Sequence, residues 1–150
     1  WLCDHVEDIA NTEGSGVYDA IDERVWGAVS MTPAALETLV GGINSISVPT
    51  LVLGGEYDTS TPVDPLVNAI YDFIGSEEKN YGIVEKTGHY TFSNACDFVN
   101  TYPDCGDGYM PIDEAHALIN RLTLAFLENL RGTQGMEVHL PPEDADLIWK

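Results

Sequence analysis

The chain has 150 residues, enough for one domain with a buried core, and at 44% hydrophobic it is too apolar to be disordered. Six basic residues stand against 25 acidic ones, and the net charge of −19 argues against nucleic acid or anionic membrane as a partner, since both need basic patches. No uncharged apolar run approaches the roughly 18 residues that would span a bilayer.

The first residues predict a helix. Residues 1–12 carry apolar side chains at helical spacing, and the glycine-rich residues 12–16 end the pattern. The N-terminus has neither an initiating Met nor the basic and apolar regions of a signal peptide. We therefore expect a mature or internal piece of a longer polypeptide.

Three further elements follow in the middle of the chain. The apolar residues 25–31 predict a buried strand, and Pro33 begins a helix with one apolar face formed by Leu36, Leu39, Val40 and Ile43. Residues 48–55 are β-branched and apolar and end in two glycines. A continuous apolar strand of this kind is typical of a parallel sheet that is covered on both faces.

The pattern then alternates again between helix and strand. Ser60 or Thr61 can cap the next helix, Pro62 suits its first turn and Gly75 follows its end. Its apolar stripe consists of Val63, Leu66, Val67, Ile70 and Phe73. Residues 81–85 predict a third strand.

A long amphipathic helix closes the pattern. It runs from about Pro111 to Arg131, stops at Gly132, and buries Ala115, Leu118, Ile119, Leu122, Phe126 and Leu130. Residues 133–150 form an acidic tail that we expect to be irregular. Alternation of helices and strands predicts an α/β fold whose parallel sheet is built from right-handed crossovers.

Two strand ends carry conspicuous polar residues. Asp58 follows the strand at 48–55, and His89 follows the strand at 81–85, 31 residues later. Functional groups collect at the carboxyl ends of parallel strands, so the two side chains can face each other. A buried carboxylate bonded to His fixes the tautomer and stabilises the imidazolium, as the base for a serine nucleophile requires.

The order Gly-x-x-Asp-x-x-x-Pro after an apolar strand, then Gly-His and a closing helix, resembles the C-terminal half of α/β-hydrolases. The nearer resemblance, over roughly residues 20–131, is to the dienelactone-hydrolase-like esterases and lipases, including the polyester hydrolase and platelet-activating-factor acetylhydrolase relatives. It implies the C-terminal part of a doubly wound, mostly parallel sheet, with residues 1–132 as half of a catalytic domain and 133–150 as its tail. It also implies Asp58 as the triad acid and His89 as the general base.

The nucleophile of these families lies in Gly-x-Ser-x-Gly at a strand-to-helix elbow, and no such motif occurs in the sequence. Gly14-Ser15-Gly16 has the wrong spacing. We expect the elbow and the oxyanion hole upstream of Trp1, so the expected partner is the N-terminal half of the same hydrolase, covalently joined or as a separate chain.

Other readings of the same residues stay open. Asp58 could cap a turn or helix, and a Gly-His pair alone is more often structural. Glu56 is a rival acid, although it sits closer to the strand and is expected to point elsewhere. His5, His116 and His139 have no comparable context and are expected on the surface or in helices.

The three cysteines suggest an exported protein. Cys96 and Cys105 flank an eight-residue polar loop, which fits a disulfide, and two free thiols are the alternative. Cys3 is left over and could pair with a residue upstream.

A second kind of site is possible in the same loop. Asp104, Asp107, Asp113 and Glu114 supply hard oxygen ligands for calcium, but their spacing does not match an EF-hand. Solvated acids near a helix N-terminus are the simpler interpretation, and we expect no metal.

Together these features predict a secreted or periplasmic serine esterase or lipase that acts on a small-molecule, lipid or polyester ester without a cofactor. Tyr90 and Phe92 could line its cleft, or could equally serve as packing residues. The competing hypothesis is a binding or structural subunit that keeps the fold without the chemistry.

Overall fold

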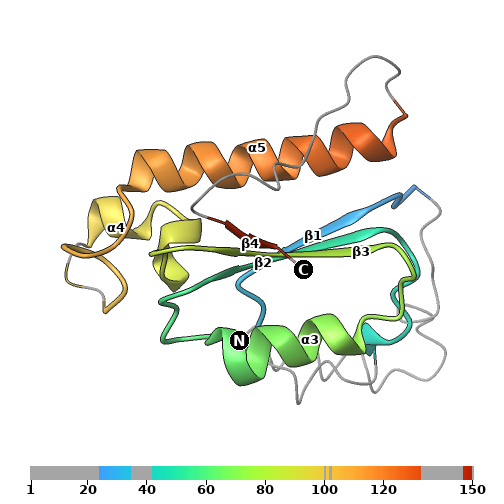
Figure 1. Ribbon diagram of the computed structural model, residues 1–150, viewed down its shortest axis with the longest axis horizontal. Helices are drawn as coiled ribbons and strands as arrows, with labels where there is room; N and C mark the ends of the chain where they lie inside the picture. The colour runs from blue at the N-terminus through green and yellow to red at the C-terminus, as the bar shows by residue number, and fades with distance from the viewer. Residues whose placement is uncertain (1–23, 35–41, 100, 102, 133–146, 150) are drawn as a thin grey trace, which may run out of the picture.

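The computed structural model describes residues 24–34, 42–99, 101, 103–132 and 147–149. They contain a four-stranded sheet in the order β1-β2-β3-β4 (Figure 1). Strands β1 (Ala28–Met31), β2 (Thr50–Gly55) and β3 (Lys79–Val84) run parallel, and β4 (Leu147–Trp149) pairs antiparallel with β3. This small, mostly parallel sheet with its helices fits the predicted α/β class.

Helices cover both faces of the sheet (Figure 1). Helix α5 (Ile112–Leu130) packs on one face and α3 (Asn68–Phe73) on the other. Because successive side chains of a strand point to opposite faces, Leu51 and Leu53 of β2 face α5 while Val52 faces α3. The α5 side of the core contains Leu51, Leu53, Val84, Leu118, Ile119, Leu122 and Phe126, and the α3 side contains Ile43, Val52, Val67, Ile70, Ile74, Tyr81 and Ile83.

The central strand matches its prediction and the first strand does not. Every residue of β2 is buried, as the continuous apolar run indicated. The strand expected over residues 25–31 covers only Ala28–Met31 and is half-buried, with Val25 51% and Trp26 50% exposed. Among the described strands β1 pairs only with β2, so it lies at the edge of the sheet, where one side lacks a neighbour to bury it.

The helix after β2 begins later than predicted. A π-helical turn, η1 (Val63–Val67), precedes α3, and neither Ser60 nor Thr61 caps it, because Pro62 holds the cap position without a side-chain hydrogen bond. The Thr61 hydroxyl donates a hydrogen bond to Asp58 Oδ2 instead. Phe73, expected in the buried stripe, is 48% exposed, and Ile74 is buried in its place.

The segment between β3 and α5 contains short helical elements that the sequence did not predict. A 3-10 turn, η2 (His89–Phe92), follows the end of β3, and α4 (Ala95–Phe98) follows η2. Helix α5 then begins and ends within one residue of its predicted ends. It buries the predicted side chains, except that Leu130 is only partly buried against the core. No described helix has the length and apolarity needed to cross a bilayer.

The prediction of an irregular tail is wrong for Leu147–Trp149, which form β4 against Gly82–Val84 through the register Gly82↔Trp149, Ile83↔Ile148 and Val84↔Leu147. A strand edge offers unpaired backbone groups, and the antiparallel pairing satisfies them. The helix predicted over residues 1–12 and most of the helix predicted from Pro33 lie outside the described residues.

Tyr81 of β3 is the aromatic centre of the α3 side. Its ring is tilted against that of Tyr71 at 5.0 Å, and its hydroxyl donates a 2.7 Å hydrogen bond to Asn68 Oδ1. Burial, and then the negative charges of Asp72 and Asp64, raise the pKa of this phenol from 10.0 to about 12.

Candidate active site

The register of β2 and β3 determines where the two polar loops meet. Gly55 pairs with Val84, so the acid loop (residues 56–62) and the base loop (residues 85–94) leave the sheet side by side at its carboxyl edge. A Cβ at Gly55 would lie 2.5 Å from the Thr87 carbonyl oxygen, so only glycine allows the loops to approach so closely. Tyr57 N donates to the same carbonyl at 2.9 Å and ties the loops together.

Asp58 and His89 are in contact. Asp58 Oδ2 lies 3.1 Å from His89 Nδ1, within the hydrogen-bond distance predicted for the pair. The Asp58 side chain is fully buried, whereas 28% of the His89 side chain is exposed. The geometric prediction is confirmed, and the catalytic role of the pair stays a prediction.

The Asp58 carboxylate is held by its own loop. Oδ1 accepts hydrogen bonds from the backbone N–H groups of Ser60 at 2.8 Å and Thr61 at 2.6 Å, and Oδ2 accepts one from the Thr61 hydroxyl at 2.7 Å. The local turn predicted as an alternative to catalysis is therefore present together with the contact to His89. The turn fixes Oδ1, and Oδ2 remains directed at the imidazole.

These contacts select one tautomer of the imidazole. A carboxylate only accepts, so the Nδ1 atom of His89 must carry the proton that is donated to Asp58. Thr61 Oγ1 also lies 3.1 Å from Nδ1, and since its single proton goes to Asp58 it can accept from Nδ1–H as well. The lone pair then resides on Nε2, for which no described residue supplies a hydrogen-bond partner. The ring is thus arranged to accept a proton at Nε2.

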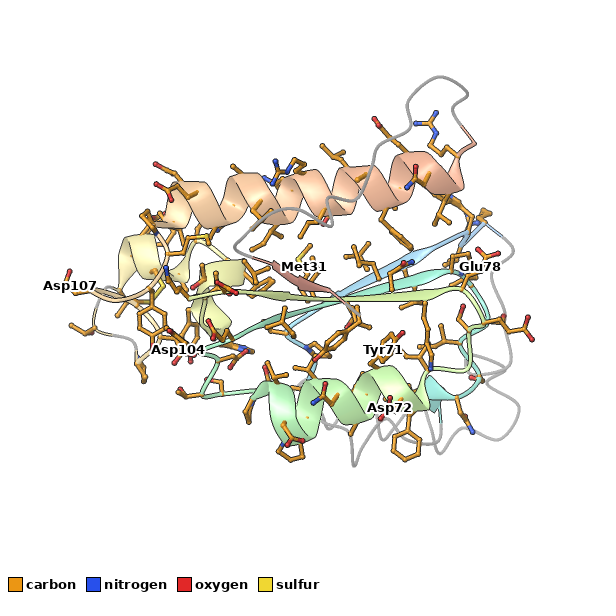
Figure 2. All side chains as sticks on the ribbon, in the orientation of Figure 1. Met31, Tyr71, Asp72, Glu78, Asp104 and Asp107 are labelled. Carbon is orange, nitrogen blue, oxygen red and sulfur yellow. A yellow bond between two sulfur atoms is a disulfide. The ribbon has the colours of Figure 1, made fainter. Side chains whose placement is uncertain are left out.

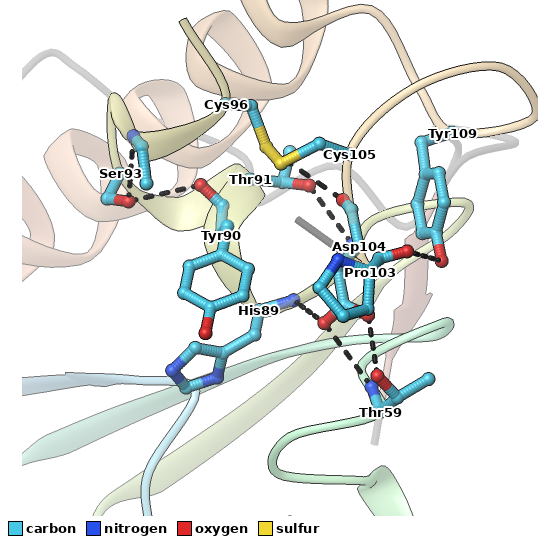
Figure 3. Close-up of a disulfide and its surroundings, with 12 residues drawn as sticks. Thr59, His89, Tyr90, Thr91, Ser93, Cys96, Pro103, Asp104, Cys105 and Tyr109 are labelled. Atoms are coloured by element: carbon cyan, nitrogen blue, oxygen red, sulfur yellow. Dashed lines mark hydrogen bonds between the residues drawn. A yellow bond between two sulfur atoms is a disulfide. The ribbon is translucent and has the colours of Figure 1, made fainter. Parts of the chain in front are cut away.

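The two aromatic residues after the histidine differ in their surroundings. The Tyr90 ring meets the His89 ring edge to face, with centroids 5.4 Å apart and an interplanar angle of 87° (Figure 3). Phe92 packs against the α5 side of the core, which favours the packing interpretation for this residue. Tyr90 is the aromatic side chain of the two that lies beside the imidazole.

Glu56, the rival acid, points away from the pair. Its Oε2 accepts a 2.9 Å hydrogen bond from the backbone N–H of Lys86, and its side chain is exposed. Lys86 has a φ of 53°, a left-handed conformation in a tight turn, and the hydrogen bond that its N–H donates to Glu56 stabilises that turn. Glu56 therefore connects the two loops on their outer side.

Asp104 occupies a place that the sequence did not predict. It is fully buried, and its two carboxylate oxygens join both loops (Figure 3). Oδ2 accepts from the backbone N–H of His89 at 2.9 Å and, more weakly, from that of Thr59 at 3.4 Å, while Oδ1 accepts from the Thr59 hydroxyl at 2.6 Å. The interpretation of Asp104 as a solvated acid is therefore wrong, because its carboxylate is buried and hydrogen-bonded within the protein.

The other acids of that group remain at the surface. Asp107, Asp113 and Glu114 are exposed. Figure 2 shows Asp107 at one outer end of the molecule, with Asp104 further in. The described residues contain no group of three His, Cys, Asp or Glu side chains that could hold a metal ion.

A disulfide joins Cys96 of α4 to Cys105, as the loop composition predicted, with the Cα atoms 5.5 Å apart (Figure 3). It closes the loop that carries Asp104 onto the segment that follows His89. A disulfide fits an extracellular location. Cys3 lies outside the described residues, as do His5 and His139.

His116 has a role that its sequence context did not indicate. It projects from α5, and its Nε2 lies 3.0 Å from the carbonyl oxygen of Thr91 in the base loop. The Thr91 hydroxyl in turn accepts from the backbone N–H of Gly88 at 3.0 Å. The base loop is therefore fastened to α5 on one side and to Asp104 on the other.

A pocket of about 300 Å³ is lined by the disulfide cysteines Cys96 and Cys105 and, among others, by Tyr109 and Met110. His89 is not among its lining residues, so this pocket is separate from the Asp58–His89 pair. Its lining includes the acids Asp104 and Asp107 but no histidine, and we place the candidate site at the pair, where a buried carboxylate contacts an imidazole.

No protein-family model matches the chain, and no curated protein sequence shows significant similarity to it. The assignment of a function therefore depends on the residues and their geometry.

Proposed function

We propose that the chain supplies the acid and the base of a Ser-His-Asp triad in an α/β-hydrolase that cleaves carboxylic esters. The observation that carries the proposal is the 3.1 Å contact between Asp58 Oδ2 and His89 Nδ1, with the carboxylate buried and the imidazole partly open to solvent. A buried carboxylate at Nδ1, together with an Nε2 that no described residue binds, is the arrangement that a general base for a hydroxyl requires.

In this reaction Nε2 of His89 takes the proton of a serine hydroxyl while the serine oxygen attacks the ester carbonyl. The imidazolium, stabilised by Asp58, returns the proton to the leaving alkoxide as the ester C–O bond breaks. Water then attacks the acyl carbon while Nε2 takes its proton, and Nε2 passes this proton to the serine oxygen as the acyl–serine bond breaks, which releases the carboxylic acid and the free serine. Asp58 keeps its charge throughout.

The serine and the oxyanion hole are assigned to polypeptide outside these 150 residues, because the sequence has no Gly-x-Ser-x-Gly. The edge position of β1 supports this assignment: among the described strands it has one partner, and its other side can pair with a strand of a nucleophile-bearing segment. That segment is either continuous with the chain or a separate chain. The substrate is a small-molecule, lipid or polyester ester, and the disulfide supports an exported enzyme.

The test uses the full-length natural polypeptide that contains these residues. We expect it to hydrolyse p-nitrophenyl butyrate and to be labelled on a serine by a fluorophosphonate. His89→Ala should lower turnover about 10⁴-fold, since a triad loses most of its catalysis when one member is removed. Circular dichroism should show an unchanged fold, because the imidazole lies at the surface of the site.

Ester hydrolysis that survives His89→Ala would contradict the proposal. Absence of any fluorophosphonate-reactive serine and of ester turnover in the natural polypeptide would leave the chain as a non-catalytic subunit with the same fold.

A further inference from the structure

Asp104 is an acid that the triad chemistry does not use. It is fully buried, and its carboxylate oxygens accept hydrogen bonds from backbone and hydroxyl donors of two separate loops. Placing a carboxylate in such a position costs free energy unless its oxygens are hydrogen-bonded, so its presence calls for an explanation in terms of those bonds.

The bonds of Asp104 reach the two residues that determine the geometry of the pair. One oxygen accepts from the hydroxyl of Thr59, the residue after Asp58, at 2.6 Å. The other accepts from the backbone N–H of His89 itself at 2.9 Å. Asp104 thus bridges the acid loop and the base loop within one residue of the atoms that meet at 3.1 Å.

We propose that Asp104 is a positioning residue that sets the distance between the acid and the base by holding Thr59 and the His89 backbone with one carboxylate. The inference rests on the proposed function for its catalytic consequence, but its structural part, the position of His89 relative to Asp58, can be measured independently.

The surroundings of Asp104 support a fixed position for this carboxylate. Gly88, the residue before the base, packs so closely that a Cβ on it would lie 2.3 Å from the Cβ of Asp104. Gly88 has an extended backbone, so the glycine is required by the contact with Asp104 and not by its φ angle. The next residue in the chain, Cys105, forms a disulfide with Cys96, and this disulfide ties the stretch of chain that carries Asp104 to α4.

A carboxylate serves both loops at once because each of its two oxygens can accept. In Asp104→Asn an amide oxygen in the Oδ2 position can still accept from the two backbone N–H groups, and the NH₂ group can donate to the Thr59 hydroxyl, which is also an acceptor. Asp104→Asn is therefore the conservative variant that can keep the bridge, and Asp104→Ala removes it.

The experiment measures ester hydrolysis and the His89 Nδ1 proton in the full-length natural polypeptide. We expect Asp104→Ala to lower kcat per titrated active site by up to about 100-fold, as displacements of catalytic groups by about 1 Å do, with KM within about twofold, whereas Asp104→Asn should stay within about threefold of the wild type. The Nδ1 proton resonance, shifted downfield by the bond to a carboxylate, should broaden or move upfield in Asp104→Ala. Asp107→Asn, an exposed acid of the same loop, is the matched control and should leave both readouts unchanged.

Thr59→Val provides a second variant if Asp104→Ala does not fold. It removes only the 2.6 Å bond, at an exposed residue, and should lower kcat about threefold to tenfold. The proposal is overturned if the folded Asp104→Ala variant, or Thr59→Val where Asp104→Ala does not fold, keeps the wild-type kcat and Nδ1 resonance while His89→Ala abolishes activity. If no ester is hydrolysed but the resonance still depends on Asp104, the proposed function fails and the positioning role stands.

Discussion

Replacement of Asp58 by Asn tests the pair most directly because it changes one atom and keeps the volume. In the wild type Oδ1 accepts from the backbone N–H groups of Ser60 and Thr61, while Oδ2 faces Thr61 Oγ1 and His89 Nδ1. In the Asp58→Asn variant, an amide oxygen in the Oδ1 position preserves both backbone bonds. The NH₂ group of the new side chain then faces Nδ1, and two donors oppose each other unless the imidazole moves its proton to Nε2.

The size of the effect follows from these contacts. A complete change of tautomer in a triad costs about 10⁴-fold in kcat, which corresponds to about 5.4 kcal/mol of transition-state stabilisation. Thr61 Oγ1, 3.1 Å from Nδ1, remains as an alternative acceptor and keeps part of the population in the active tautomer. We therefore expect a loss of about 10³-fold for Asp58→Asn. Adding Thr61→Val should bring the loss to about 10⁴-fold, whereas Thr61→Val alone should cost little.

The assay is kcat/KM for p-nitrophenyl butyrate, combined with ¹⁵N shifts of the His89 ring that report which nitrogen carries the proton. Glu56→Gln is the matched control, because it makes the same chemical change two residues away on a side chain that bonds Lys86. The free energy of unfolding should fall by no more than about 1.5–3 kcal/mol, the worth of one hydrogen bond to a charged group. A loss of less than tenfold in Asp58→Asn, or an unchanged tautomer with lost activity, would refute this reasoning.

Three further predictions concern stability. Leu122 is fully buried on the α5 side, so Leu122→Ala should lower the free energy of unfolding by about 2–5 kcal/mol in urea titrations. Leu124, on the same helix, is 57% exposed, and Leu124→Ala should change the free energy of unfolding by less than about 0.5 kcal/mol. Equal losses in the two variants would place the core elsewhere. Because the folded-state pKa of Tyr81, about 12, exceeds its ordinary value of 10.0, stability that is complete below pH 10 should fall by about 2–3 kcal/mol as the pH approaches 12, and Tyr81→Phe should abolish that fall. Mass spectrometry without reductant should detect the Cys96–Cys105 peptide pair, and Cys96→Ser/Cys105→Ser should cost about 2–3 kcal/mol; two free thiols in the native protein would exclude the bond.

The elements that periodicity defines strongly could be predicted from the sequence. Strand β2 is apolar throughout because it is buried on both faces, and α5 repeats its apolar residues along one face over about five turns. The burial of β1 could not be predicted, because an apolar run indicates a tendency to be buried but not whether a neighbouring strand is present. Strand β4 follows an acidic, proline-containing stretch and has only three residues, too few for an alternating pattern to emerge.

The site could be predicted as far as strand order determines it. Asp58 and His89 follow adjacent strand ends, and parallel strands bring such ends together whatever the intervening sequence. The sequence predicts Thr61 as a possible helix cap, but its hydroxyl binds Asp58 instead, so this prediction is wrong. A Ser or Thr before a proline has the same local sequence pattern whether it caps the helix or binds a residue of its own loop, and the sequence cannot distinguish the two roles. The hydrogen bonds of Asp104 and His116 span 15 to 45 residues, and no local pattern distinguishes these side chains from solvated ones.

The contacts of His89 are distributed unevenly around it, and this distribution is itself a functional argument. The backbone is held by Asp104, the turn that follows is held by His116 through Thr91, and Nδ1 is held by Asp58 and Thr61. These hydrogen bonds engage the backbone and Nδ1, the Tyr90 ring meets the imidazole edge to face, and among the described residues none binds Nε2. The side chain is 28% exposed, so the hydrogen bonds fix the position and the tautomer of the ring without enclosing it. A ring held at Nδ1, with no described residue bound to Nε2, has the arrangement that the proposed general base requires.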